Sequence, residues 1–395
     1  MVWFHGGGYA LGSKISNGSP IGLLQTSFEG GGEGAIYVAM NYRLAAFGWL
    51  AGPTLQSNGT ANAGFYDQRL ALEWVQTHIH LFGGDPGRVT AFGESAGGGS
   101  ILHQITAYGG AQGSNSTPFQ QALMQSPAFI PSPGHYTHET IFQAFLKNAN
   151  VSTLQAARQL PSSILLAANK ATQATAFYGT FNFGPSPDGS FVPDLPGNLL
   201  LQGSYDHQLV VLAAHNSNEG NRYTDPKATN DTAFTEYMQL YFPQANPAVI
   251  SYLSETLYPP IYNGSLPYTT PFGRLDLAIS EFTFTCNTNF LARAFNNQTH
   301  NYLFSIPPGN HTEDVPYTYF DGPNAAVLND TVATTLQSYI TTFVSTGDPN
   351  RAGLPTFPIY GSQATVLNLN QTFIDEITDP VANPRCLWWQ KALYF

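Results

Sequence analysis

The segment VTAFGESAGGG at residues 89–99 constrains this chain more than any other, because it joins an apolar, strand-like run to a small-residue helix start through a Gly-x-Ser-x-Gly turn. An abrupt strand-to-helix turn holds its central residue, here Ser95, in a strained backbone conformation. Gly93 and Gly97 suit such a turn, since residues without a side chain let the strand and the helix approach closely. The pattern predicts a nucleophile elbow with Ser95 as the candidate nucleophile. By itself, such a string also arises by chance in a chain with 38 glycines.

A second glycine-rich segment, HGGG at residues 5–8, follows the apolar run at residues 2–4, upstream of the serine. In α/β-hydrolases a loop at this place in the chain supplies an amide to the oxyanion hole. Acyl transfer needs donors aimed at an oxygen that becomes negative only in the transition state, and the loss of one donor costs about 2.7–4 kcal/mol. We expect the amides of Gly7, Gly8 and Ala96 to form this site. The alternative is a plain glycine-rich turn after a strand.

Further blocks occur in order along the whole chain, and this order is more specific than any single motif. Together they resemble the type B carboxylesterase/lipase family, which is the cholinesterase-like branch of the α/β-hydrolases, and they are most similar to its fungal members. The resemblance implies a serine ester hydrolase. The blocks are VWFHGGGY (2–9), NYRL (41–44), FGWL (47–50), DQRLAL (67–72), FGGDP (82–86), GESAG (93–97), PDG (187–189), NEG (218–220), His311 with DVPY (314–317), and Cys386.

Short apolar runs, which are typical of buried parallel strands, alternate with helical patterns. The candidate strands are residues 35–40, 89–92, 121–125, 209–213 and 300–304. One helical stripe would cover the sheet just before the elbow strand, and it consists of Ala71, Trp74, Val75, His78, Ile79 and Phe82. The alternation predicts an α/β fold, with a mostly parallel central sheet and helices on both faces. The resemblance adds helical insertions at residues 131–187 that form part of the pocket wall.

We expect residues 1–395 to form a single α/β-hydrolase domain, because large α/β units often remain undivided and no repeat or linker interrupts the chain. At its start, the chain departs from the pattern of the family that it resembles. Family members carry a substantial segment ahead of the glycine-rich block, whereas only four residues precede His5 here. Four residues are too few for a usual strand of about 5–6 residues. The chain is therefore expected to lack the usual N-terminal segment, and it begins without a signal-peptide pattern.

Chain order narrows the partners of the serine, because α/β-hydrolases run serine, acid, histidine. Of the ten histidines, His300 and His311 follow every plausible acid. His300 stands at the entry of a predicted strand, and His311 follows that strand at the end where active-site loops gather, so His311 is the better candidate base. Glu219 follows the strand predicted at 209–213 and matches the glutamate that the family uses. Asp225 is the alternative acid.

These roles predict acyl transfer. Ser95 Oγ would attack an ester carbonyl while neutral His311 takes its proton, and Glu219 would orient the imidazole and stabilise the imidazolium. The alcohol then leaves, and water hydrolyses the acyl-enzyme. The rate should rise with pH through the pKa of the histidine, which is about 6.5 when unperturbed. No cofactor and no metal is required.

Three further charged residues receive roles from their positions. Arg43 and Asp67 match a pair that forms a salt bridge in the family, so both are expected to belong to the scaffold. Glu94 lies beside the nucleophile. It is interpreted as a buried carboxylate that organises water near His311, with a part in the framework of the elbow as the alternative.

The cysteines and the glycosylation sequons indicate in which cellular compartment the protein is found. Cys286 and Cys386 would be two buried thiols without further information, but the resemblance implies that they form a disulfide. Asn-x-Ser/Thr sequons, which are glycan acceptors in secreted proteins, are plentiful. The full-length natural protein is expected to be a secreted glycoprotein. The sequons are at Asn17, Asn58, Asn115, Asn150, Asn230, Asn263, Asn297, Asn310, Asn329 and Asn370.

The amino-acid composition limits the classes of molecule that the protein is expected to bind. The net charge is −11 and only 10% of residues are charged, without a Lys/Arg cluster, which argues against nucleic acid. The chain contains no run of about 18 apolar residues, which is the length that would predict a transmembrane helix. The expected partner is a small-molecule or lipid ester, and the aromatic content of 13% favours a fairly apolar pocket.

Two alternatives to an active esterase remain at this stage. The first is a catalytically silent esterase-like fold that serves as a binding module, as in cell-adhesion relatives. Such relatives commonly lose the nucleophile, whereas Ser95, Glu219 and His311 are all present here. The second is a truncated product that folds poorly and is inactive.

Overall fold

The computed structural model describes residues 1–29, 32–110, 116–132 and 134–394. Its centre is an eight-stranded sheet in the order β2-β1-β3-β4-β5-β6-β7-β8. All neighbouring strands are parallel except β7 and β8, which are antiparallel. The strands are β1 (Val2–Phe4), β2 (Val38–Ala39), β3 (Thr90–Glu94), β4 (Gln121–Gln125), β5 (Val210–Asn216), β6 (His300–Phe304), β7 (Thr365–Leu369) and β8 (Ile374–Thr378).

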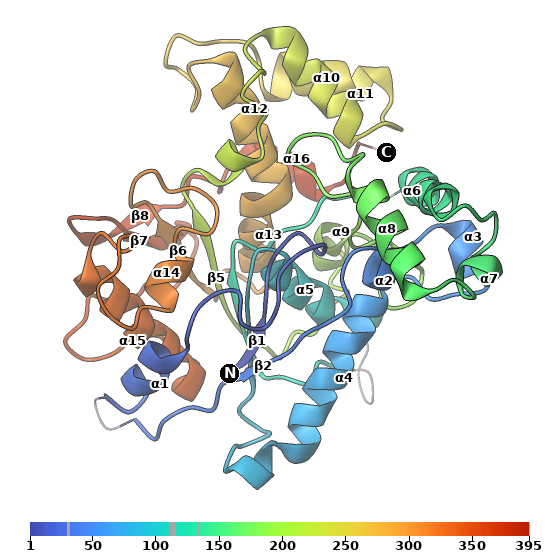
Figure 1. Cartoon of the computed structure of the whole chain (residues 1–395). Helices are drawn as coiled ribbons and strands as arrows, with labels where there is room; N and C mark the ends of the chain where they lie inside the picture. The colour runs from blue at the N-terminus through green and yellow to red at the C-terminus, as the bar shows by residue number, and fades with distance from the viewer. Residues whose placement is uncertain (30–31, 111–115, 133, 395) are drawn as a thin grey trace.

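Helices surround this sheet (Figure 1). Among the described residues, no helix is both long and apolar enough to cross a membrane. The α-helices are α1 (Ile21–Thr26), α2 (Ala46–Trp49), α3 (Pro53–Gln56), α4 (Ala63–His78), α5 (Ala96–Ile105), α6 (His135–Asn148), α7 (Leu154–Ala157), α8 (Ser162–Gln173), α9 (Pro196–Leu201), α10 (Asp231–Tyr241), α11 (Pro247–Tyr252), α12 (Pro271–Ser280), α13 (Cys286–Ala294), α14 (Val315–Thr318), α15 (Asp330–Thr346) and α16 (Pro384–Gln390). The short 3₁₀ turns are η2 (Ile79–Phe82), η3 (Ala107–Gly109) and η5 (Glu219–Arg222), and the π-helical turns are η6 (Leu253–Leu257) and η7 (Glu281–Thr285).

Both faces of the sheet are buried, because side chains along each strand alternate between two hydrophobic clusters. On β3, Ala91 belongs to one cluster and Phe92 to the other, and on β4 Met124 and Leu123 divide in the same way. Helices α4, α5 and α13 cover the first face, whereas α1, α14 and α15 cover the second (Figure 1). The predicted α/β class, with a mostly parallel sheet between helical layers, is confirmed.

The strand predictions agree with the structure to different degrees. Residues 121–125 and 300–304 are strands as predicted, and those predicted at 89–92 and 209–213 are each shifted or extended toward their C-terminal ends. The prediction at 35–40 was too long, because β2 has two residues at the edge of the sheet.

The first residues of the chain are fewer than a strand of usual length needs, and Val2–Phe4 form a short strand of three residues inside the sheet. Its two neighbours, β2 and β3, hold this short segment from both sides. The hairpin of β7 and β8 was not predicted, because no motif that guided the prediction falls between the block at 314–317 and Cys386.

The helical stripe predicted before the elbow was wrong at two of its positions, Trp74 and Phe82. Val75 and Ile79 are buried, but the side chains of Trp74 and Phe82 are 45% and 64% exposed. Helix α4 buries a face that also includes Phe65. A spacing rule cannot distinguish this face from the neighbouring one when both carry large apolar residues.

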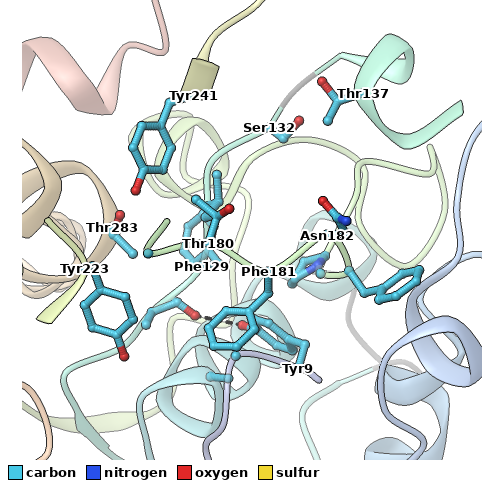
Figure 2. A pocket seen from close by; sticks show the side chains of 18 of the residues that line it. Tyr9, Phe129, Ser132, Thr137, Thr180, Phe181, Asn182, Tyr223, Tyr241 and Thr283 are labelled. Atoms are coloured by element: carbon cyan, nitrogen blue, oxygen red, sulfur yellow. Dashed lines mark hydrogen bonds between the residues drawn. The ribbon is translucent and has the colours of Figure 1, made fainter. Parts of the chain in front are cut away.

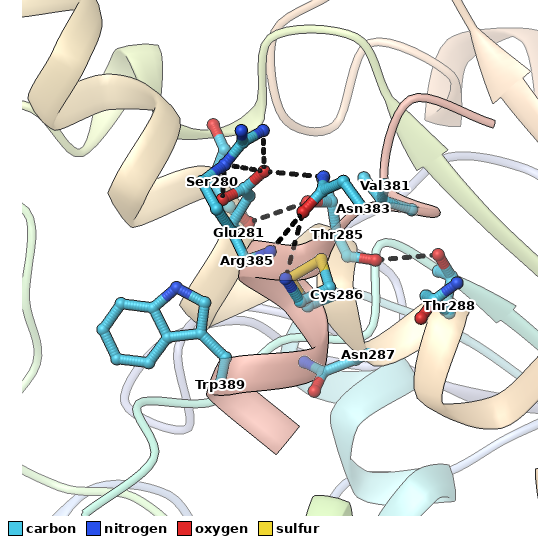
Figure 3. Close-up of a disulfide and its surroundings, with 12 residues drawn as sticks. Ser280, Glu281, Thr285, Cys286, Asn287, Thr288, Val381, Asn383, Arg385 and Trp389 are labelled. Carbon is cyan, nitrogen blue, oxygen red and sulfur yellow. Dashed lines mark hydrogen bonds and ion pairs between the residues drawn. A yellow bond between two sulfur atoms is a disulfide. The ribbon is translucent and has the colours of Figure 1, made fainter. Parts of the chain in front are cut away.

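The predicted disulfide between Cys286 and Cys386 is present and joins α13 to α16 (Figure 3). The two Cα atoms are 5.1 Å apart. Close by, the buried carboxylate of Glu281 accepts hydrogen bonds from the guanidinium of Arg385, at 2.7 and 2.8 Å, and from the side-chain amide of Asn383, at 3.0 Å. A covalent bond and a buried ion pair therefore attach the C-terminal helix to the segment of α12, η7 and α13.

We predict that replacing both cysteines by alanine lowers the free energy of unfolding by up to about 4.7 kcal/mol, because the disulfide closes a loop of 100 residues in the unfolded chain. Guanidinium unfolding followed by circular dichroism measures this difference, with reduced wild type as the control. Equal unfolding midpoints for oxidised wild type and the double variant would contradict the prediction.

Candidate active site

Ser95 lies at a strained turn between β3 and α5. Its φ and ψ are 58° and −125°, a conformation that residues with a side chain rarely adopt. The flanking glycines are required by close packing, since a Cβ at Gly97 would lie 2.0 Å from the carbonyl oxygen of Phe4, and one at Gly93 would lie 2.8 Å from the backbone of Gly97. The predicted strand–turn–helix geometry of residues 89–99 is therefore the observed one.

Ser95, His311 and Glu219 form a continuous hydrogen-bonded chain. Nε2 of His311 is 2.8 Å from Oγ of Ser95, and Nδ1 of His311 bonds Oε2 of Glu219. The three residues follow the C-terminal ends of β3, β6 and β5, respectively, where the parallel strands of the sheet bring separate loops together. All three are buried, with 6%, 1% and 0% of their surface exposed.

The other carboxylate oxygen of Glu219 is held by residues to which the sequence analysis assigned no role. Oε1 accepts hydrogen bonds from the hydroxyl of Ser126 and the backbone amide of Asn216, both at 2.6 Å. Ser126 directly follows β4, so its position after a central strand was a usable sequence signal. Asn216 ends β5, three residues before Glu219.

A second buried carboxylate, Asp314, lies behind this group. It accepts hydrogen bonds from the hydroxyl of Tyr302 at 2.7 Å, from the side-chain amide of Gln125 at 3.1 Å and from that of Asn216 at 3.3 Å. Asp314 is thereby connected to Glu219 through Asn216. Its place in the block 314–317 was noted in the sequence, but the residues that surround it come from three strands and could not be identified there.

The alternative residues considered for the acid and the base make different contacts. His300 opens β6 and its Nδ1 lies 3.0 Å from the carbonyl oxygen of Pro358. The carboxylate of Asp225 accepts a hydrogen bond from the hydroxyl of Tyr237 at 2.7 Å. The structure therefore places neither residue in the hydrogen-bonded chain of Ser95.

The sequon at Asn310, beside the candidate base His311, is the one least expected to carry a glycan. Asn310 directly precedes His311 and is 8% exposed, and its side-chain amide donates to Glu313 at 2.9 Å. Because an N-glycan needs an accessible acceptor, this sequon is closed in the folded protein. Asn115 lies outside the described residues.

The amides expected in the oxyanion hole are free of protein acceptors. Within the described residues, the backbone N–H groups of Gly7, Gly8 and Ala96 donate no hydrogen bond. Gly8 and Ala96 line the same pocket as Ser95, whereas Gly7 is not among the lining residues. The left-handed backbone at Gly8, with φ of 58°, and the ring of Phe181, 2.2 Å from the place of a Cβ, require a glycine there.

The buried carboxylates near His311 have opposite pKa shifts. Burial raises the pKa of Glu94 to about 8. Its Oε1 lies 3.3 Å from Nε2 of His311 but without hydrogen-bond geometry, and it has no other partner. Burial also disfavours the charge on Glu219, but His311 and the hydrogen bonds from Ser126 and Asn216 outweigh it and lower the pKa of Glu219. At neutral pH the charge therefore resides on Glu219, and Glu94 is protonated.

Burial and the neighbouring carboxylates also shift the pKa of His311. Burial alone would lower the pKa of His311, but the negative charge of Glu219 and its hydrogen bond to Nδ1, together with the charge of Asp314, raise it above its usual value of 6.5. The ring is also confined by aromatic neighbours, with the ring centroid of Phe284 at 4.4 Å and that of Tyr223 at 5.4 Å.

A pocket lined mostly by apolar groups opens at Ser95 (Figure 2). Its walls come from the glycine-rich loop, the turn after β4 and the segment at 131–187 that was predicted to contribute. That segment supplies helix α6 and the loop around Phe181. Lining residues include Tyr9, Phe129, Ile130, Ile141, Phe177, Phe181, Phe183 and Phe284.

Arg43 and Asp67 form a two-pronged ion pair outside the pocket. Nε and Nη2 of Arg43 are each 2.7 Å from an oxygen of Asp67. The pair links the segment after β2 to α4, and the Arg43 side chain is 54% exposed. Exposed pairs of this kind contribute about 0–1 kcal/mol.

The fold and the site together define an α/β-hydrolase, with a strained serine at the turn that follows a central parallel strand. The chain belongs to the carboxylesterase family, whose family model matches residues 1–389. It is a serine ester hydrolase.

Similar proteins agree with this placement. The chain is 43% identical to "Carboxylesterase patB" of Penicillium expansum, in an alignment that covers 99% of this chain and 70% of that protein. It is 32% identical to a "Secreted lipase" of Arthroderma benhamiae, over 89% of this chain and 67% of that protein. Among solved structures, Aspergillus niger EstA has a TM-score of 0.84 and 26% identity, covering 99% of this chain and 80% of EstA.

We predict that Glu94→Gln, which mimics the protonated carboxyl, leaves the pH dependence of kcat/KM close to that of wild type below pH 8 and diverges from it above that value. The reason is that burial keeps Glu94 neutral until its pKa of about 8 is passed. Hydrolysis of p-nitrophenyl butyrate from pH 6 to 9 by both proteins measures this. Profiles that already separate at pH 6 would show that Glu94 is charged throughout.

Proposed function

We propose that Ser95, His311 and Glu219 are the catalytic triad of a carboxylic ester hydrolase that works through an acyl-enzyme. The observation that carries this proposal is the hydrogen-bonded chain from Ser95 Oγ through His311 to Glu219, which opens into an apolar pocket. Ser95 Oγ attacks the ester carbonyl and His311 Nε2 accepts its proton. Glu219 stays ionised, holds the proton on Nδ1 and stabilises the imidazolium.

The developing negative oxygen is stabilised by backbone amides in the proposed mechanism. Gly8 and Ala96 line the pocket beside Ser95, and their N–H groups donate no hydrogen bond within the described structure. Gly7 supplies a third amide in this proposal. His311 then gives its proton to the leaving alcohol, and a water molecule repeats the sequence on the acyl-enzyme to release the acid.

Glu94 and Asp314 act indirectly in this scheme. Protonated Glu94 lies beside Nε2 of His311 and orders water there in the deacylation step. Asp314 shares the side-chain amide of Asn216 with Glu219, at 3.3 and 3.4 Å, and so fixes the orientation of that amide. Both are positioning residues in this proposal, because Glu94 acts through water beside His311 and Asp314 acts through the amide of Asn216.

We also infer that the protein acts outside the cell and carries N-glycans. Relatives from Arthroderma benhamiae and Botryotinia fuckeliana are named "Secreted lipase" and "Secreted lipase 1". The disulfide of Cys286 and Cys386 supports the same inference, since such bonds persist in oxidising compartments. Exposed sequon residues such as Asn58, Asn150 and Asn263 are accessible to glycans.

We predict that Ser95→Ala lowers kcat for p-nitrophenyl butyrate by about 10⁴-fold or more, because loss of a triad member leaves only the contributions of the oxyanion hole and binding. Initial rates with purified protein measure the effect. Ser338→Ala is the matched control, since this buried hydroxyl only bonds a carbonyl of its own helix.

Covalent labelling gives an independent readout of the same proposal. A fluorophosphonate should add once to wild type and to Ser338→Ala, at Ser95, and not to Ser95→Ala. Labelling at another serine, or undiminished turnover by Ser95→Ala, would overturn the proposed nucleophile.

We further predict that kcat/KM rises with pH and that its half-maximal point lies above 6.5. His311 must be neutral to accept the proton, and its folded-state pKa is raised, so activity is lost as the pH falls through that raised value. A rate profile from pH 5 to 9 measures this limb. A half-maximal point below 6 would contradict the electrostatic role of the surrounding carboxylates.

A further inference from the structure

The glycine loop after β1, Gly6, Gly7 and Gly8, has no side chains by which the structure could hold it. Glycine has more conformational freedom in the unfolded chain than any other residue. Two of these glycines, Gly7 and Gly8, have positive φ angles of 114° and 58°. Oxyanion-hole donors stabilise a transition state only when they are in position before the reaction. The loop must therefore be held through the residues at its two ends, His5 and Tyr9.

The first end of the glycine loop is held by Tyr42. The hydroxyl of Tyr42 donates a hydrogen bond of 2.6 Å to the carbonyl oxygen of His5. The two rings are stacked, with their centroids 4.4 Å apart and an angle of 14° between their planes. Both residues are buried. Because the carbonyl of His5 belongs to the peptide unit that leads into Gly6, the hydroxyl of Tyr42 fixes the start of the loop.

The second end of the glycine loop is held by Tyr9. The hydroxyl of Tyr9 donates to the carbonyl oxygen of Ala128 at 2.8 Å, and the carbonyl oxygen of Tyr9 accepts from the amide of Ala45 at 2.8 Å. The amide of Ala128 in turn donates to the carbonyl oxygen of Ser95 at 3.0 Å. Tyr9 therefore connects the glycine loop to the backbone of the nucleophile through one intervening residue.

Tyr42 and Ala45 belong to one short segment, residues 41–45, which we call the loop clamp. At Ala45 the φ and ψ angles are 49° and −134°, which are strained for a residue with a side chain. Such strain persists only where the surroundings hold it, and it is concentrated at functional sites. The clamp is itself attached to α4, because the backbone amide of Arg43 donates to Asp67 at 3.0 Å in addition to their ion pair.

We propose that Tyr42 and Tyr9 are positioning residues whose hydroxyls hold the oxyanion-hole amides in place, so that they contribute to kcat and not to substrate binding. This inference rests on the proposed function, because it takes the amides of Gly7 and Gly8 to receive the negative oxygen. Each hydroxyl donates to a backbone carbonyl. Removing a hydroxyl keeps the aromatic ring but loosens the glycine loop, so the loss appears in the transition state.

The test uses Tyr42→Phe and Tyr9→Phe, which each remove one hydroxyl. Each should lower kcat for p-nitrophenyl butyrate by about 3- to 10-fold, the effect of one lost hydrogen bond, and leave KM nearly unchanged. Rates are expressed per active site, counted by titration with a fluorophosphonate. A purely structural role would lower the number of active sites and leave kcat per site at the wild-type value, which would overturn the proposal.

Inhibition by a pentyl trifluoromethyl ketone reports on the oxyanion hole directly, because this ketone adds to the serine as a tetrahedral hemiketal. Its inhibition constant should rise in each variant by the factor by which kcat/KM falls, whereas that of pentyl methyl ketone should stay constant. The matched control is Tyr339→Phe, which removes a hydroxyl on α15 that donates to the carbonyl of Pro355 at 2.7 Å. It should match wild type throughout. Equal changes for the two ketones in Tyr42→Phe and Tyr9→Phe would overturn the proposal.

Failure of the proposed function has a different signature, since wild type would then neither hydrolyse the ester nor bind the trifluoromethyl ketone more tightly than the methyl ketone. The clamp is still tested in that case by hydrogen–deuterium exchange of peptides from residues 5–14. There the amides of Ala10 and Leu11 donate to the carbonyl of Gly7 at 3.1 and 2.9 Å. Faster exchange in Tyr42→Phe and Tyr9→Phe than in Tyr339→Phe supports the clamp, and equal exchange overturns it.

Discussion

The buried carboxylate of Glu219 is the interaction on which the rest of the site depends. A carboxylate with no exposed surface is stable only if donors replace the water it has lost. Ser126, Asn216 and His311 provide those donors. Each follows or ends a different parallel strand, so the register of β4, β5 and β6 determines whether they meet. The sheet is therefore required for the electrostatics of the site as well as for its shape.

The second carboxylate beside the histidine shows how environment divides two similar groups. Glu94 is as buried as Glu219, yet its Oε1 has no hydrogen-bond donor. Burial without donors favours the protonated form, whereas burial with three donors favours the ion. Two acidic side chains within reach of one imidazole can thus have different charges at the same pH, a division often seen where proton transfer occurs. If both were charged, His311 would be held in its protonated form and could not accept the proton of Ser95.

The sequence predicted what depends on local backbone geometry or on order along the chain. Ser95 could be found because a strand–turn–helix with close packing requires glycine at 93 and 97. Ser126 and Asp314 were not assigned roles, because what they bind becomes visible only in the folded protein: Ser126 bonds Glu219, 93 positions away, and Asp314 bonds Gln125, 189 positions away, as well as the nearer Tyr302. The exposed ring of Trp74 was assigned to the wrong face, since periodicity gives the spacing of a helix face but not which face meets the sheet.

The π-helical turn η7 supplies Thr283 and Phe284 to the pocket wall. A π turn inserts one extra residue into a helix and changes the direction of the side chains around it. Phe284 of this turn packs against the imidazole of His311, and the hydroxyl of Thr283 has no hydrogen-bond partner in the described structure. Such a distortion needs support from its surroundings, and the supports flank it in the chain: Glu281 binds Arg385 on one side, and Cys286 is bonded to Cys386 on the other. Both supports come from the C-terminal helix, so the geometry of the pocket wall depends on residues about 100 positions away, in a helix that supplies none of the pocket's lining residues.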